Sequence, residues 1–175
     1  MFEPPLDLKG ACILLVNDGR SRAPGMKALE RIAKSFLKGV WVYAPEEEQG
    51  GAGHSFSLYN NFRVSRISAR RFANGGSPTD CVMMALTEYM SNKRPALVLS
   101  GVNRGQNSGD SVISAVAVIL EATLLGIPAI AVSEQVLAVK IQFKTAKTLA
   151  PSVIKKLLRE KWPADVFMNV NFPDV

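Results

Sequence analysis

The chain has 175 residues, of which 47% are hydrophobic and 21% charged, the composition of one globular domain. This composition excludes a disordered, collagen-like or disulfide-stapled chain, and no apolar run approaches the roughly 18 residues of a membrane span. With 21 Lys and Arg against 15 Asp and Glu, the net charge is +6, which permits an anionic partner without requiring one. The basic residues are not interleaved with aromatic residues, so we expect no nucleic-acid-binding face.

In chain order, short apolar runs alternate with amphipathic stretches. Runs that are apolar on both faces suit buried parallel strands, and one-sided stripes with a period of 3.6 residues suit helices. The expected strands are Cys12–Val16, Val40–Ala44, Ala96–Leu99, Ile127–Val132 and Val166–Val170. The expected helices, which lie between them, are Pro24–Leu37, Thr79–Met90, Asp110–Leu125 and Phe143–Leu158. This alternation predicts an α/β fold, a three-layer sandwich with a mostly parallel, Rossmann-like sheet.

One segment departs from the alternation. Between Ser55 and Phe72, polar and apolar side chains alternate on both sides of Tyr59-Asn60-Asn61. This pattern predicts a β-hairpin, with its strands at His54–Leu58 and Phe62–Ile67, inserted into the sandwich and exposed to solvent. We expect residues 1–175 to form a single domain that contains this hairpin.

The cellular compartment is suggested by the N-terminus and by the cysteines. The first ten residues include two prolines and two acids, which is not the pattern of a secretory signal. Cys12 and Cys81 lie in apolar segments, which favours buried free thiols over the alternative of a disulfide. We therefore expect a cytoplasmic protein.

Polar, glycine-bearing loops follow the first three parallel strands, beginning at residues 17, 45 and 100. The carboxyl ends of parallel strands share one edge of a sheet, so these loops should converge there. Asp18 supplies a carboxylate, and Asn103 and Asn107 supply amide oxygens, the ligands that hard divalent cations prefer. Glycines in these loops let the backbone approach a phosphate, and Arg104 is placed to pair with one.

Each of these residues also has a structural interpretation. Asp18 could be a turn or cap residue, and Asn103 could hold its own loop by side-chain hydrogen bonds. The triplet Glu46-Glu47-Glu48 is typical of a solvated loop, and Asp80 is placed to begin a helix. These alternatives stay open on the sequence alone.

Several other chemistries are not supported. No Lys-Ser/Thr pair follows Gly50–Gly53, so the segment is not a P-loop. His54 and Ser55 lack the G-x-S-x-G context of a serine hydrolase, and one histidine with two cysteines is too few for a zinc site. A dinucleotide-dependent oxidoreductase would need a G-x-G-x-x-G after the first strand, which the chain lacks.

Several blocks together resemble a known family in collinear order over nearly the whole chain. They are Ile13–Asp18, Ala23–Leu29, Ala44–Pro45, Glu48–Gln49, Gly51–His54, Gly76–Val82, Leu97–Gly105, Glu121–Pro128 and Asn169–Pro173. The most specific are those from Ser77 to Cys81 and from Ser100 to Gly105. On these motifs the chain is similar to the SurE family of metal-dependent nucleoside monophosphate phosphatases.

The resemblance implies a phosphomonoesterase that converts nucleoside monophosphates to nucleoside and phosphate. It implies that Asp18 and Asn103 are the catalytic residues and the metal ligands. The cofactor would be a divalent metal, Mg²⁺ or Mn²⁺, with Ca²⁺ as a further candidate. It also implies a homodimer or homotetramer, and we expect the exposed hairpin, with Tyr59 and Phe62, to contribute to that contact.

The chain departs from the family pattern at four places. The second metal-binding aspartate falls on Gly19 and the metal-binding serine on Gly50. The family's Tyr-Ser-Gly-Thr phosphate loop is about two residues shorter after Asp110, with Ala115 at the threonine position. The family's C-terminal arm is expected to be absent after Val175. Two hypotheses explain these departures. The protein is a catalytically impaired nucleotide-binding module, or the sequence lacks short loops of a longer enzyme that is itself intact.

Overall fold

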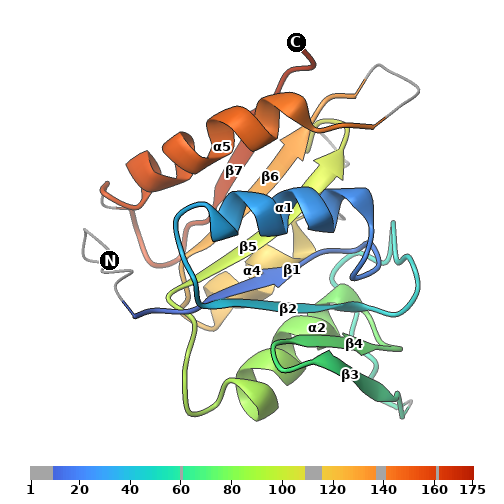
Figure 1. Ribbon diagram of the computed structural model, residues 1–175. Helices are drawn as coiled ribbons and strands as arrows, with labels where there is room; N and C mark the ends of the chain where they lie inside the picture. Colours follow the sequence, from blue (N-terminus) through green and yellow to red (C-terminus); the bar gives the residue numbers. More distant parts are fainter. Residues whose placement is uncertain (1–9, 60, 109–115, 137–140, 161) are drawn as a thin grey trace.

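The structure is a computed structural model that describes residues 10–59, 61–108, 116–136, 141–160 and 162–175 (Figure 1). Its strands are β1 (Ile13–Val16), β2 (Val40–Pro45), β3 (Val64–Ser68), β4 (Arg71–Asn74), β5 (Leu97–Arg104), β6 (Ala129–Glu134) and β7 (Met168–Phe172). Its helices are α1 (Pro24–Lys34), α2 (Pro78–Met84), a π-helical turn η1 (Ala85–Tyr89), α4 (Ala117–Leu124) and α5 (Lys144–Leu157). All seven strands form one sheet in the order β3-β4-β2-β1-β5-β6-β7, and every neighbouring pair is parallel except β3 with β4.

The central strands bury both faces, as their continuous apolar runs predict. On β1, Ile13 and Leu15 lie in one core with α1 and α5, whereas Leu14 and Val16 lie in a second core with α2 and α4. Figure 1 shows α1 and α5 together on the near face of the sheet and α2 and α4 on the other face. This arrangement confirms the three-layer α/β sandwich with a mostly parallel sheet.

Strand β5 is longer than its sequence pattern indicates. The apolar run ends at Leu99, but the strand continues to Arg104, and Ser100 and Asn103 within it are buried. The pairing with β1 ends at Ser100, and the pairing with β6 carries the strand on to Arg104. The expected loop from residue 100 is therefore strand up to residue 104.

The predicted hairpin exists, but its placement along the chain was wrong. The antiparallel pair is β3 with β4, whereas residues 54–58 are not in a strand. Because β4 also pairs with β2, the hairpin forms one edge of the main sheet and is not an insertion outside it. Phe72 of β4 stacks on Trp41 and Tyr43 of β2, and this burial selects the later segment. Alternation alone could not reveal that contact.

The helices follow local signals at their starts. Helix α2 begins with a capping box in which Ser77 and Asp80 exchange hydrogen bonds, which confirms Asp80 as a first-turn residue. The expected helix from Thr79 to Met90 ends in the π-helical turn η1. Part of the expected helix Asp110–Leu125 lies outside the described residues, and the described part is α4.

Both cysteines are buried and free, as predicted. Among the described residues, no helix combines the length and apolar character that crossing a membrane would need.

A charge cluster joins α1 to the β4 edge of the sheet. Glu30 accepts hydrogen bonds from Lys34 and Arg71, and Arg71 also donates to the backbone oxygen of Ser21 at 2.7 Å. Burial by itself would raise the pKa of Glu30. The hydrogen bonds and charges of Lys34 and Arg71 outweigh burial and hold that pKa below its ordinary value.

We expect Arg71→Met to lower the free energy of unfolding by about 1 kcal/mol near pH 7. A lowered carboxylate pKa stabilises the folded state above the unfolded pKa, and this contribution is lost as pH falls through the folded pKa. The loss of unfolding free energy caused by Arg71→Met should therefore become smaller toward acid pH. The portion that comes from the lost hydrogen bond to the Ser21 backbone oxygen should persist. Urea unfolding at pH 7 and pH 3 measures this, with Arg70→Met as the control on an exposed arginine. A deficit that is the same at both pH values would contradict the assignment.

Candidate metal and phosphate site

The pairing of β1 with β5 determines where the two predicted ligands lie. The strands are parallel, with Val16 opposite Ser100. Asp18 follows Val16 by two residues, and Asn103 follows Ser100 by three, so both lie at the carboxyl edge of adjacent strands. The structure thus brings the two sequence-predicted site residues to the same edge of the sheet.

Asp18 occupies a half-buried position at this edge. Its backbone oxygen accepts a hydrogen bond from the amide of Gln49 at 2.8 Å, which ties the loop after β1 to the loop after β2. Burial raises the pKa of the Asp18 carboxyl, and the neighbouring negative charge of Glu48 raises it further, against hydrogen bonds from backbone amides. A cation at this position would offset both the desolvation and the repulsion.

Glu48 is a contributor that the sequence analysis missed. Its triplet indicated only a solvated loop, yet its charge acts on Asp18. Glu48 lies near Asp18 because the residue after it, Gln49, donates its backbone amide to the Asp18 backbone oxygen beside the end of β1. A sequence signal for this role was present, because Glu48 and Gln49 together form one of the blocks that resemble the SurE family.

Asn103 is oriented by a chain of asparagines. Its side-chain nitrogen donates to Oδ1 of Asn107 at 3.4 Å, which leaves its own side-chain oxygen for a ligand. The Asn107 backbone amide donates to Oδ1 of Asn171 at 2.7 Å, and Nδ2 of Asn169 donates to the Asn107 backbone oxygen at 2.8 Å. Strand β7 therefore holds the loop that follows β5.

Asn107 itself is buried, with 4% of its surface exposed. Its Nδ2 has no hydrogen-bond partner among the described residues. A buried donor without a partner is costly, so this amide is suited to a bound anion or water. Arg104, at the end of β5, is exposed, in keeping with the sequence expectation that it is free to meet a phosphate.

The loop after β2 is attached at several points. Nε2 of His54 lies 2.8 Å from Oε2 of Glu121 on α4, and the Glu121 side chain is only 8% exposed. The hydroxyl of Ser77 donates to the Ser55 backbone oxygen at 2.6 Å, and the Ser57 amide donates to Asp80 at 3.2 Å. The loop is therefore held against both α2 and α4.

His54 thus serves as the partner of a buried acid. The sequence analysis excluded a serine triad and zinc site but did not find this contact. A signal was present: Glu121 is the one charged residue in the apolar sequence of α4. A buried carboxylate in such a helix requires a hydrogen-bonding partner from outside it.

Gly19 and Gly50, where the sequence resemblance implies that metal ligands are replaced, both have room for a side chain. A Cβ on Gly50 would meet nothing within 4 Å, and one on Gly19 would meet the Ala23 Cβ at 3.4 Å, an ordinary contact. Neither position therefore requires glycine for steric reasons. The shortened loop with Ala115, the remaining departure within this region, lies outside the described residues.

The donor set fits a hard divalent cation held partly by water. Asp18 offers a carboxylate and Asn103 an amide oxygen, and Glu48 adds negative charge nearby. Mg²⁺ commonly keeps several waters and uses only one or two carboxylates. In the described part of the chain, no group of three or more His, Cys, Asp or Glu side chains forms a metal cage. Oxygen donors of this kind are the ligands that Mg²⁺ and Mn²⁺ prefer.

Comparison with known proteins identifies relatives over the same region. The family model described as "Survival protein SurE" matches residues 13–175. The "5'-nucleotidase SurE" of Parvibaculum lavamentivorans is 45% identical over 172 residues, 95% of this chain and 62% of the relative. That of Paramagnetospirillum magneticum is 46% identical over 177 residues, 99% of this chain and 68% of the relative.

The fold agrees with these sequence matches. The crystal structure of the SurE protein from Aquifex aeolicus superimposes with a TM-score of 0.85 at 34% identity, covering 94% of this chain and 66% of that one. The chain thus spans about two thirds of the length of the relatives that it matches. Together the comparisons confirm the family resemblance found in the sequence.

The backbone at the end of β5 leaves no space for a side chain at one glycine. Gly101 has a φ of +125°, and a Cβ there would lie 2.1 Å from the backbone oxygen of Val132 on β6. We expect Gly101→Ala to lower the free energy of unfolding by about 3 kcal/mol, because both the φ value and the contact become unfavourable. Urea unfolding measures the loss. Gly50→Ala is the control and should change stability by less than about 0.5 kcal/mol; equal effects at the two positions would refute the assignment.

Proposed function

The chain belongs to the SurE family, and we propose that it is a divalent-metal-dependent phosphomonoesterase that hydrolyses nucleoside monophosphates to nucleoside and phosphate. The observation that carries this proposal is the position of Asp18 and Asn103 at the carboxyl ends of the paired strands β1 and β5. The name of the relatives, 5'-nucleotidase SurE, supports the substrate class.

The residues have separate roles in this proposal. Asp18 and Asn103 would hold Mg²⁺ or Mn²⁺, which supplies Lewis-acid polarisation of a phosphoryl oxygen and a more acidic bound water. Asn107 fixes the rotamer of Asn103 so that its oxygen faces the ligand. Arg104 and the unpartnered amide of Asn107 would donate to the phosphate and offset the charge that develops during its transfer.

A second candidate function rests on the ligands that the chain does not carry. Glycine at positions 19 and 50 leaves one carboxylate and one amide as direct metal donors, with Glu48 as a nearby charge. Affinity for a hard cation falls with the number of charged ligands. The alternative is therefore a nucleotide-binding module of the same fold that binds without turnover.

We also propose that the protein self-associates as a homodimer or homotetramer and works in the cytoplasm. The segment before β3 supports a contact surface, because Leu58 and Tyr59 are 77% and 96% exposed. Phe62, expected to be exposed with Tyr59, is instead half-buried. The two buried free thiols are consistent with a reducing compartment.

The first test is phosphate release from nucleoside 5′- and 3′-monophosphates with Mn²⁺ or Mg²⁺. We expect EDTA to reduce release to background and Asp18→Asn to reduce kcat/KM at least about 100-fold, since metal-assisted charge stabilisation contributes several kcal/mol. Asp165→Asn, on an exposed carboxylate, is the control and should leave the rate unchanged. Release that is insensitive to EDTA would reject the proposed mechanism. Nucleotide binding without release, measured by calorimetry, would favour the binding module.

The second test adds the carboxylate that glycine replaces. Gly19→Asp places a second acid beside Asp18 with only an ordinary contact to Ala23. We expect the Mn²⁺ concentration for half-maximal phosphate release to fall about tenfold, because an added charged ligand strengthens cation binding. Gly19→Asn is the matched neutral control and should have a smaller effect. If neither variant lowers the metal requirement, position 19 does not face the cation.

A further inference from the structure

The helical layer formed by α1 and α5 carries an unusual excess of positive charge. Lys27 and Arg31 lie one turn apart on α1, and Lys144 and Lys147 lie one turn apart on α5. Helix α5 contains no acidic residue. The only acid of α1, Glu30, is engaged by Lys34 and Arg71. No negative charge in either helix is therefore left to neutralise the four cations.

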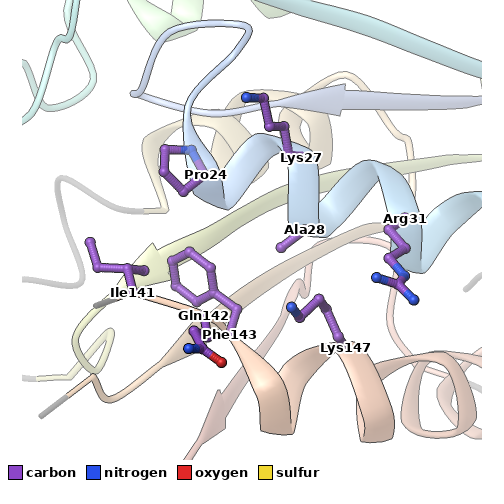
Figure 2. A pocket seen from close by; sticks show the side chains of 8 residues that line it. All are labelled: Pro24, Lys27, Ala28, Arg31, Ile141, Gln142, Phe143 and Lys147. Carbon is purple, nitrogen blue, oxygen red and sulfur yellow. The ribbon is translucent and has the colours of Figure 1, made fainter. Parts of the chain in front are cut away.

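Three of these cations, Lys27, Arg31 and Lys147, border a hollow between the two helices. The hollow has a volume of about 640 Å³, and it is lined by Pro24, Lys27, Ala28, Arg31, Ile141, Gln142, Phe143 and Lys147. Figure 2 shows the Arg31 guanidinium and the Lys147 amine directed into the gap between α1 and α5, with Pro24, Ile141 and Phe143 at one end. A second hollow of about 330 Å³, lined by Arg31, Lys144, Lys147 and Thr148, shares Arg31 and Lys147 with the first. We call the two hollows together the α1/α5 groove.

The chemistry of the α1/α5 groove is that of an anion site with an apolar wall. In the part of the chain that the structure describes, the side chains of Arg31, Lys144 and Lys147 form no ion pair. An arginine and a lysine that face each other across a gap repel unless an anion lies between them, and a guanidinium fits phosphate oxygens in a bidentate manner. Pro24 and Ile141 add an apolar surface beside these charges.

We propose that the α1/α5 groove binds a phosphorylated small molecule, with its phosphate between Arg31 and Lys147 and its apolar part against Pro24 and Ile141. The volume is within the range of small-molecule sites, and a hollow with apolar side chains at one end suits a compact ligand better than a nucleic-acid backbone. This site shares no residue with the metal site around Asp18 and Asn103 and does not depend on the proposed function.

The test is calorimetric titration in EDTA at about 0.15 M salt, where long-range charge effects are screened. The probes are phenylphosphonate, whose carbon–phosphorus bond a phosphomonoesterase does not cleave, and inorganic phosphate. We expect phenylphosphonate to bind about tenfold more tightly than phosphate, because its ring covers apolar surface. The variant Arg31→Gln/Lys147→Gln should weaken phenylphosphonate binding at least tenfold.

Two control proteins separate this site from general charge and from the metal site. Lys156→Gln/Arg159→Gln removes one lysine and one arginine from exposed positions elsewhere on this layer and should change the dissociation constant less than twofold. Asp18→Asn should also change it less than twofold. The proposal is overturned if wild-type protein shows no saturable binding up to about 10 mM phenylphosphonate. It is also overturned if the two double variants lose binding equally, if Asp18→Asn abolishes binding, or if only a mixed-sequence RNA oligonucleotide binds.

Discussion

Strands β1 and β5 run side by side in the same direction, with Val16 opposite Ser100, and this pairing places Asp18 and Asn103 at the same edge of the sheet. Buried apolar side chains on both faces of β1 keep the register, because a shift by one residue would exchange the two cores. The packing of the two cores therefore fixes the position of the site residues at the ends of β1 and β5. A carboxylate and an amide separated by 85 positions in the chain lie at the carboxyl ends of neighbouring strands for this reason.

Hydrogen bonds around this edge hold the polar loops in place. Gln49 binds the backbone at Asp18, His54 binds Glu121 on α4, and Asn171 on β7 binds the amide of Asn107. The first bond ties the loop after β1 to the loop after β2, and the other two connect a loop to an element that the hydrophobic cores fix. Buried polar groups are tolerated only when they are paired, so these contacts are specific in position. Among the described residues, Nδ2 of Asn107 is one of several buried side-chain atoms without a hydrogen-bond partner, and it lies next to Asn103, whose side chain donates to Asn107.

The sequence predicted the parts of the fold that depend on local pattern. The five apolar runs became parallel strands, and Ser77 and Asp80 formed the cap that begins α2. Other features depend on contacts between distant residues, which a local pattern does not contain. Stacking of Phe72 on Trp41 and Tyr43 favours a hairpin that lies later in the chain than the alternating pattern predicts. Pairing with β6 extends β5 beyond Leu99. The position of Asp18 and Asn103 at one edge of the sheet was predictable from the strand pattern, whereas the influence of Glu48 and the His54–Glu121 contact needed the folded chain.

The molecule has two places suited to phosphate, and they differ in the source of positive charge. At the edge of β1 and β5 the charges of Asp18 and Glu48 repel a phosphate, and a cation bound there would offset this repulsion. In the α1/α5 groove the cations are Arg31 and Lys147 themselves. We therefore expect metal to strengthen anion binding at the first place and to leave anion binding at the second unchanged. Position 19 bears on the first place alone. A carboxylate there, for which the backbone leaves room, would strengthen metal binding beside Asp18 and would not alter the α1/α5 groove.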